Sequence, residues 1–176
     1  MSPRISRLEK HQVDEDTAKI YDVYQQERGN VPNMFRTAAH RPEIFRTMIA
    51  HFRAVMNTGT VPAKLKELAI VRTSQLNDCE YCLASHTALA RRHGWSVEQI
   101  TDLANFRNRS DFSDAEKAAI ELAERTTRDS NTVDDAFWNE LRQYYDEGEI
   151  IELLAAIGLF NYFNRFNNAL HMEPTK

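Results

Sequence analysis

The sequence predicts an all-α protein, and three observations support this fold class. Apolar residues recur at helical spacing through most of the chain. Only five glycines and five prolines occur, and most of them stand between these periodic segments. No segment alternates β-branched with polar residues, and no Asn-Gly or Asp-Gly pair marks a hairpin. The 176 residues, 42% of them apolar, suffice for a single domain over 1–176 with seven to nine helices.

Proline and glycine set the expected helix boundaries in the N-terminal half. A helix over residues 14–28 stops at Gly29 and belongs to an N-terminal helical extension spanning 1–30. Pro32 and Pro42 suit first-turn positions, where the missing N–H of proline is no loss. Apolar residues at i, i+3, i+4 and i+7 predict a helix from Pro42 to Asn57, and Pro62 opens the next.

Capping signals define the helices of the second half. Ser96 and Ser113 each begin a capping box, because a Gln or Glu follows three residues later. Cys79 begins a helix, with Asn77 and Asp78 as candidate caps, and Gly94 stops it. The expected helices cover residues 79–93, 96–106, 113–128, 134–145 and 149–170, with an exposed loop at 107–112.

The last expected helix, 149–170, is apolar around much of its circumference. A helix of this kind is buried on several sides. It serves either as the central helix of one subunit or as a subunit contact, and the pattern leaves both roles open.

Charge and hydropathy restrict the class of partner and the location. The net charge of −4 argues against nucleic acid or an anionic membrane as a main partner. The first ten residues are polar and charged, unlike a signal peptide. The longest apolar run, from Leu153 to Phe160, is far shorter than the roughly 20 residues that a membrane helix needs. We therefore expect a cytoplasmic protein.

The chemistry of the chain concentrates in Cys79-Glu80-Tyr81-Cys82, which contains its two cysteines, and in His86. On one helix, Cys79, Cys82 and His86 share a narrow stripe, and the two thiols lie near disulfide range. A helix N-terminus favours the thiolate and lowers a thiol pKa. In a reducing compartment such a pair is redox-active or metal-bound more often than structural.

His86 and Glu67 complete a predicted proton relay. His86 follows Cys82 by one helical turn, so its imidazole can exchange protons with the sulfur or with a leaving oxygen. Glu67 lies in an apolar stretch of the preceding helix, twelve residues before Cys79. It reaches His86 only if the two helices pack antiparallel across a short turn. Otherwise Glu67 is a solvated charge.

Other motif interpretations fit less well. Covalent haem attachment requires His directly after the second cysteine, where Leu83 stands, and a thioredoxin-like centre requires a strand before the pair. Two cysteines in one helical turn without a second CxxC make a poor structural zinc site, so no metal is expected. Residues 88–106 have helix-turn-helix spacing, but the second helix is acidic. No nucleotide or flavin motif occurs, so no cofactor is expected.

Glu67, Cys79, Cys82 and His86, together with the segments 62–72 and 77–86 around them, resemble the signature of the alkylhydroperoxidase D-like (AhpD-like) proteins. These belong to the carboxymuconolactone decarboxylase superfamily. The resemblance is strongest over a redox core at about 42–104, and residues 161–168 are similar to the family's closing helix. It implies a helical fold that assembles as a trimer or hexamer and reduces hydroperoxides through the two thiols.

The resemblance also implies roles for single residues. Cys82 is the deeper, peroxidatic thiol, Cys79 is the more accessible resolving thiol, and His86 with Glu67 relays protons. Tyr81 stands where well-known members carry a second histidine, and a phenol is a poor base at neutral pH. The relay therefore relies on Glu67 and His86, with Tyr81 as an auxiliary group. The disulfide is recycled by an external dithiol of the lipoyl type.

Two alternatives of other classes remain. A carboxymuconolactone decarboxylase-type enzyme would act on a lactone by proton transfer and would need no cysteine pair. A non-enzymatic thiol redox sensor would use the same cysteines but would not need Glu67. Both can be separated from the peroxidase by the behaviour of Cys82 and Glu67 variants.

Overall fold

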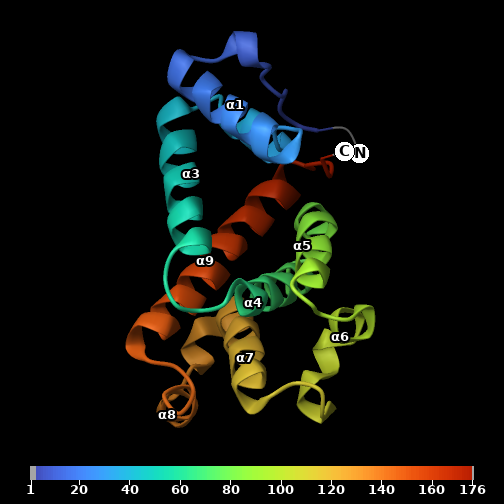
Figure 1. The fold of residues 1–176 in the computed structure, drawn as a ribbon, viewed down its shortest axis with the longest axis vertical. Coiled ribbons are helices and arrows are strands. Elements are labelled where there is room, and N and C mark those ends of the chain that lie inside the picture. Colours follow the sequence, from blue (N-terminus) through green and yellow to red (C-terminus); the bar gives the residue numbers. More distant parts are fainter. Residues whose placement is uncertain (1–2, 176) are drawn as a thin grey trace.

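A computed structural model describes residues 3–175 of the chain, and within this range it is entirely helical, with no strand. This confirms the predicted fold class (Figure 1). In chain order the α-helices are α1 (Glu15–Arg28), α2 (Asn33–Ala38), α3 (Pro42–Asn57), α4 (Ala63–Leu76), α5 (Glu80–Arg92), α6 (Val97–Thr101), α7 (Asp114–Asp129), α8 (Asp135–Leu141) and α9 (Glu147–Ala169), and the 3₁₀-helices are η1 (Lys10–Gln12), η2 (Leu103–Asn108) and η3 (Ser130–Thr132). None of the helices between residues 3 and 175 is long and apolar enough to cross a membrane.

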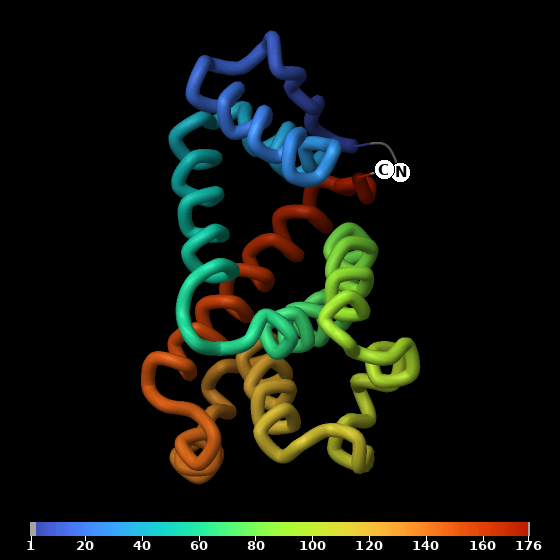
Figure 2. The backbone as a smooth tube through the Cα atoms, in the orientation of Figure 1, coloured from blue at the N-terminus to red at the C-terminus, as the bar shows by residue number. Residues whose placement is uncertain are grey.

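The long helix α9 runs obliquely across the molecule and links its two ends (Figure 1). Helices α1 and α3 lie at one end, and α6, α7 and α8 lie at the other (Figure 1). Helix α4 is central, because it packs against α5, α7 and α9. The dark blue segment before α1 and the red segment after α9 lie side by side (Figure 2), and a hydrogen bond from Arg4 N to Leu170 O joins them over 3.1 Å.

Helix α4 is buried along most of its length, charged residues included. Lys66 is 1% exposed, and its ammonium donates to the carbonyls of Val55 and Thr58, each over 2.8 Å, and pairs with Glu152 at 3.0 Å. Arg72 pairs with Glu124 of α7 in the same buried layer. Buried charges need partners of this kind to offset their lost hydration. The charged pairs therefore fix α4 against its neighbours.

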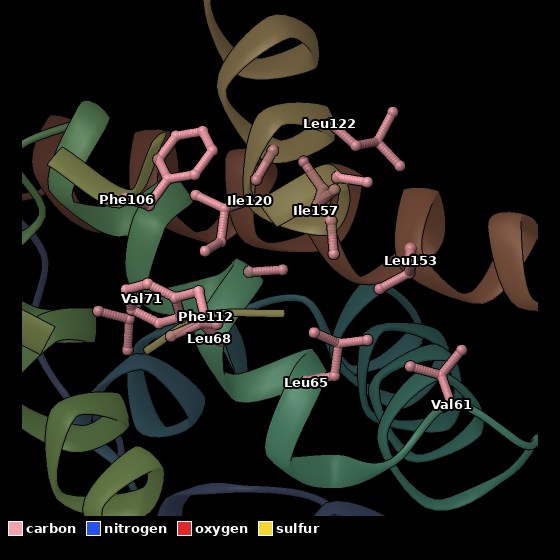
Figure 3. Close-up of a cluster of buried hydrophobic side chains, with 14 of the residues drawn as sticks. Val61, Leu65, Leu68, Val71, Phe106, Phe112, Ile120, Leu122, Leu153 and Ile157 are labelled. Atoms are coloured by element: carbon pink, nitrogen blue, oxygen red, sulfur yellow. The ribbon is translucent and has the colours of Figure 1, made fainter. Parts of the chain in front are cut away.

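Two groups of buried apolar residues surround α4. In one of them, Leu65, Leu68 and Val71 of α4 face α7 and α9 (Figure 3). The other joins α1, α2 and α3 to the C-terminal half of α9 and includes both cysteines and Tyr81. The candidate site therefore lies where α5 meets this second group.

The helix boundaries confirm the capping predictions at Ser96 and Ser113, whose side chains accept hydrogen bonds from the first turns of α6 and α7. Asp14, where the first helix was expected to begin, is the N-cap of α1. The cap expected for the cysteine helix was wrong. Cys79 is itself the N-cap of α5, Asn77 is the C-cap of α4, and Asp78 between them has a left-handed φ of 49°. Because the chain reverses within two residues, α4 and α5 pack directly on each other.

The segment after α6 also differs from the prediction. The helix expected to run to Phe106 ends at Thr101 and is followed by η2, in which Asn105 has non-helical angles. The expected exposed loop at 107–112 ends in a buried residue, because Phe112 is 3% exposed and packs 5.5 Å from the ring of Trp95. Farther along, α8 stops at Leu141 rather than at Tyr145. The hydroxyl of Tyr145 instead donates to Ala115 O over 2.6 Å.

Candidate active site

Both cysteines are free thiols at the start of α5, and they lie near each other. Cys79 caps the helix: its N–H donates to Ser74 O over 3.0 Å, and its carbonyl accepts from Leu83 N over 3.0 Å. Cys82 follows in the first turn. The tight turn between α4 and α5 therefore places both thiols at the end of the helix whose free N–H groups favour negative charge.

The two thiols ionise unequally. A hydrogen bond from the Cys82 thiol is the main cause that lowers the pKa of Cys79 to about 7, and burial opposes it. The same contact with Cys79, together with burial, raises the pKa of Cys82 well above its usual range. The pair therefore loses a first proton easily and holds the second firmly.

The predicted contact between Glu67 and His86 is present. Nδ1 of His86 lies 2.7 Å from Oε2 of Glu67, and the side chain of Glu67 is only 4% exposed. The ring of His86 also packs edge-on against Phe160 of α9, with ring centroids 4.5 Å apart. Because Nδ1 is held by Glu67, Nε2 is the nitrogen left to act on a bound molecule.

A small pocket of about 60 Å³ lies between the thiol of Cys82 and the ring of His86. Cys82 and His86 line it, and Asn167 of α9 lies beside them. The remaining wall is mainly apolar and aromatic, with Arg28 as its one basic member: Arg28, Pro32, Met34, Phe35, Phe52, Tyr81, Ser85, Phe160 and Phe163. A larger surface groove of about 880 Å³ lies between α1 and the C-terminal tail. It is lined by none of the four predicted catalytic residues, Glu67, Cys79, Cys82 and His86.

The pocket reverses the expected order of access to the two thiols. Cys79, expected to be the more accessible, is 0% exposed and does not line the pocket, whereas Cys82 is 4% exposed and does. The cause is the position of Cys79 in the helix cap, where Ser74 O and Leu83 N hold its backbone and the sulfur lies inside the second group of buried residues. A molecule in the pocket therefore meets Cys82 first.

Tyr81 lines the same pocket, but its hydroxyl is already engaged. It accepts a hydrogen bond from Met34 N over 3.2 Å and shares another of 3.2 Å with the hydroxyl of Thr175. Burial raises the pKa of Tyr81, so the phenol stays protonated. Tyr81 therefore fastens the C-terminal tail and the start of α2 beside the thiols.

Sequence reasoning missed the asparagines of α9. Asn167 donates from Nδ2 to Cys82 Sγ over 3.4 Å, and Asn164 donates to Ser74 Oγ over 3.1 Å and lowers the pKa of both thiols. Both are almost completely buried. The signal was available, since asparagines at 161, 164 and 167 form one polar stripe on an otherwise apolar helix.

Within residues 3–175, no group of three or more His, Cys, Asp or Glu side chains is arranged to hold a metal ion. The groups present suit thiol and proton chemistry. They comprise a nucleophilic sulfur at a pocket, a second sulfur in contact with it, and an imidazole oriented by a carboxylate.

The chain matches known proteins around this site. The model of the carboxymuconolactone decarboxylase family matches residues 42–125, which include the expected redox core. The protein named "Uncharacterized protein YdfG" of Bacillus subtilis is 35% identical over 106 residues, which cover 60% of this chain and 72% of that protein.

Solved structures share the whole fold. A crystal structure from Ralstonia eutropha, described as an alkylhydroperoxidase AhpD core and peroxidase-related protein, has a TM-score of 0.89 at 27% identity and covers 99% of this chain and 93% of that one. The debrominase Bmp8 has a TM-score of 0.83 at 22% identity, covering 97% and 91%, so the fold alone does not determine the reaction. By the matched region, the relative and the fold, the chain belongs to the carboxymuconolactone decarboxylase family and has an AhpD-like structure.

Proposed function

We propose that the protein is a thiol-dependent peroxidase that reduces hydroperoxides. The observation that carries this proposal is the arrangement of Cys82 at a pocket that also contains His86, with the ring held by buried Glu67 at 2.7 Å. A lactone decarboxylase would have no use for the cysteine pair. A thiol sensor would have no use for a carboxylate buried against the imidazole.

In the first step the pair supplies a thiolate at Cys82. The first charge forms on Cys79, whose pKa is the lowered one, and transfer of the Cys82 proton to Cys79 moves that charge to Cys82. The thiolate attacks the terminal oxygen of the hydroperoxide: the S–O bond forms, the O–O bond breaks, and Cys82 becomes a sulfenic acid. The first proton of the pair passes to Nε2 of His86, whose Nδ1–H donates to the Glu67 carboxylate, and His86 returns that proton to the departing alkoxide, which leaves as an alcohol.

In the second step Cys79 attacks the sulfenic sulfur of Cys82. A disulfide forms, and the sulfenic oxygen leaves as water after taking up a proton. Two electrons from an external dithiol then restore both thiols. Because the pocket reaches Cys82, the incoming dithiol forms its mixed disulfide there, and a lipoyl group, with its two thiols on a slender chain, suits this route.

Turnover of an organic hydroperoxide with a panel of dithiols, lipoamide among them, tests the proposal. We expect activity in the wild type, none in Cys82→Ser and a strong reduction in Glu67→Gln. Lactone decarboxylation that survives Cys82→Ser would instead establish the decarboxylase. The sensor would be established if hydroperoxide oxidised the thiols once without catalytic turnover and the rate of that oxidation did not change in Glu67→Gln.

We propose further that the protein forms a homo-oligomer, of three or six subunits as in the family it belongs to. Ile151 and Tyr162, which are 64% and 44% exposed, lie with Ala155 and Gly158 along one face of α9. Exposed apolar side chains in one stripe suit contact with a second copy. We expect light scattering to report a mass of three or six chains, and Ile151→Lys to lower it. A wild-type monomer would refute this.

A further inference from the structure

Asn167 has an unusual environment. It is 1% exposed, it comes from α9, and it lines the pocket with Cys82 and His86. Its Nδ2 donates to Cys82 Sγ over 3.4 Å, while its Oδ1 is buried with no hydrogen-bond partner. Buried acceptors without partners are rare because they lose hydration and gain nothing in return.

The other asparagines of the stripe use their oxygens fully. Oδ1 of Asn161 accepts from Asn77 over 2.9 Å and from Arg165 over 3.0 Å. Oδ1 of Asn164 accepts from Asn77 over 3.0 Å. Over residues 3–175, the other buried side-chain polar atom without a partner is Nε of Arg7, far from the thiols in sequence and outside this pocket. The unused acceptor therefore belongs to the one asparagine that lines the pocket.

We propose that Asn167 is a catalytic residue whose Oδ1 accepts a hydrogen bond from the O–H of the hydroperoxide. The amide then contacts both reactants: its N–H holds the sulfur of Cys82, and its oxygen holds the terminal oxygen of the substrate. The substrate class is a hydroperoxide with a free O–H and a small organic group, because the pocket measures only about 60 Å³. This inference rests on the proposed peroxidase function and extends it.

The role fits the balanced reaction. The O–H proton stays on the terminal oxygen as that oxygen moves to sulfur, so the Asn167 contact persists in the sulfenic acid. The O–O electron pair leaves with the alkoxide, which takes its proton from Nε2 of His86. Asn167 thus orients the oxygen that is transferred, and His86 serves the oxygen that leaves.

The test compares two reactions of the same thiol in the reduced, full-length protein. One is the stoichiometric oxidation of Cys82 by ethyl hydroperoxide, followed by mass spectrometry. The other is modification of Cys82 by methyl methanethiosulfonate, which requires a thiolate but has no hydrogen to donate. The ratio of the two rate constants separates substrate orientation from the general reactivity of the sulfur.

We expect Asn167→Leu to lower this ratio about tenfold, as the loss of one productive hydrogen bond predicts. Asn167→Asp keeps the acceptor and loses the donor, so we expect both rates to fall while the ratio holds. Asn139→Leu, the same change at an exposed position of α8, should leave the ratio unchanged. Circular dichroism confirms folding, and Asn167→Ala, which removes the same acceptor, replaces the leucine variant if that variant does not fold.

Two other outcomes overturn the proposals separately. If wild-type Cys82 is not oxidised by ethyl hydroperoxide, the peroxidase function fails before any variant is measured. If the wild type is oxidised but Asn167→Leu lowers both rates equally, Asn167 only supports the thiolate, and the inference alone is wrong. A ratio that falls in Asn167→Asp would equally contradict a role for Oδ1.

Discussion

At the scale of single residues, the site depends on the unequal environments of two sulfurs. Cys79 is enclosed in a helix cap and receives the hydrogen bond, whereas Cys82 donates it and lines the pocket. A thiolate stabilised at one sulfur and used at the other needs only a short proton transfer between them. The unequal pair therefore provides both easy ionisation and a nucleophile within reach of the substrate.

The ionisation of the pair makes a spectroscopic prediction. Because the pKa of Cys79 is lowered to about 7, one thiolate should appear as the pH rises through that value. Absorbance at 240 nm should follow this single step. In Cys82→Ala the donated hydrogen bond is lost, so the midpoint should move to higher pH. An unchanged midpoint in that variant would show that the two sulfurs do not interact.

Tyr81 makes a second prediction at this scale. Its hydroxyl bonds Met34 N and Thr175 and no thiol, so Tyr81→Phe should remove an anchor of the tail and leave the relay intact. We expect the free energy of unfolding to fall by about 1–2 kcal/mol. Peroxidase activity should stay within a few-fold of the wild type. A complete loss of turnover in a folded Tyr81→Phe protein would place the phenol in the chemistry.

At the scale of helices, α4 and α9 supply polar groups inside an apolar environment. Glu67 of α4 reaches His86 of α5, and Asn167 of α9 reaches Cys82, because α4 packs against both other helices. The ion pair of Lys66 with Glu152 fixes α4 to the N-terminal half of α9, at the far end from the thiols. The position of Glu67 therefore depends on a neighbouring pair that takes no part in the reaction.

Lys66→Ala tests this dependence. The variant removes the donor of two buried carbonyls and the cation that pairs with Glu152, and we expect a loss of about 3–5 kcal/mol in the free energy of unfolding, measured by urea denaturation. Lys19→Ala, at an exposed position of α1, is the matched control and should leave the urea midpoint nearly unchanged. Equal midpoints for the two variants would show that the buried pair does not hold α4.

At the scale of the whole molecule, sequence reasoning succeeded mainly where neighbours along the chain decide the structure, although the cap of the cysteine helix was an exception. Capping boxes at Ser96 and Ser113 marked true helix starts. The contact of Glu67 with His86 followed from a short turn between consecutive helices. Access to the thiols could not be predicted in this way, because α1, α2 and α9, distant in sequence, form the walls of the pocket. The break at Asn105 likewise depends on the packing of Phe106 and Phe112 against other helices.

The central claim is that Cys82, and not Cys79, reacts with the hydroperoxide. The most direct measurement treats Cys79→Ser and Cys82→Ser with one equivalent of ethyl hydroperoxide in the presence of dimedone, followed by mass spectrometry. We predict a dimedone adduct on Cys82 in Cys79→Ser and no consumption of hydroperoxide by Cys82→Ser. An adduct on Cys79 in Cys82→Ser, formed as fast as the wild type consumes hydroperoxide, would contradict the account.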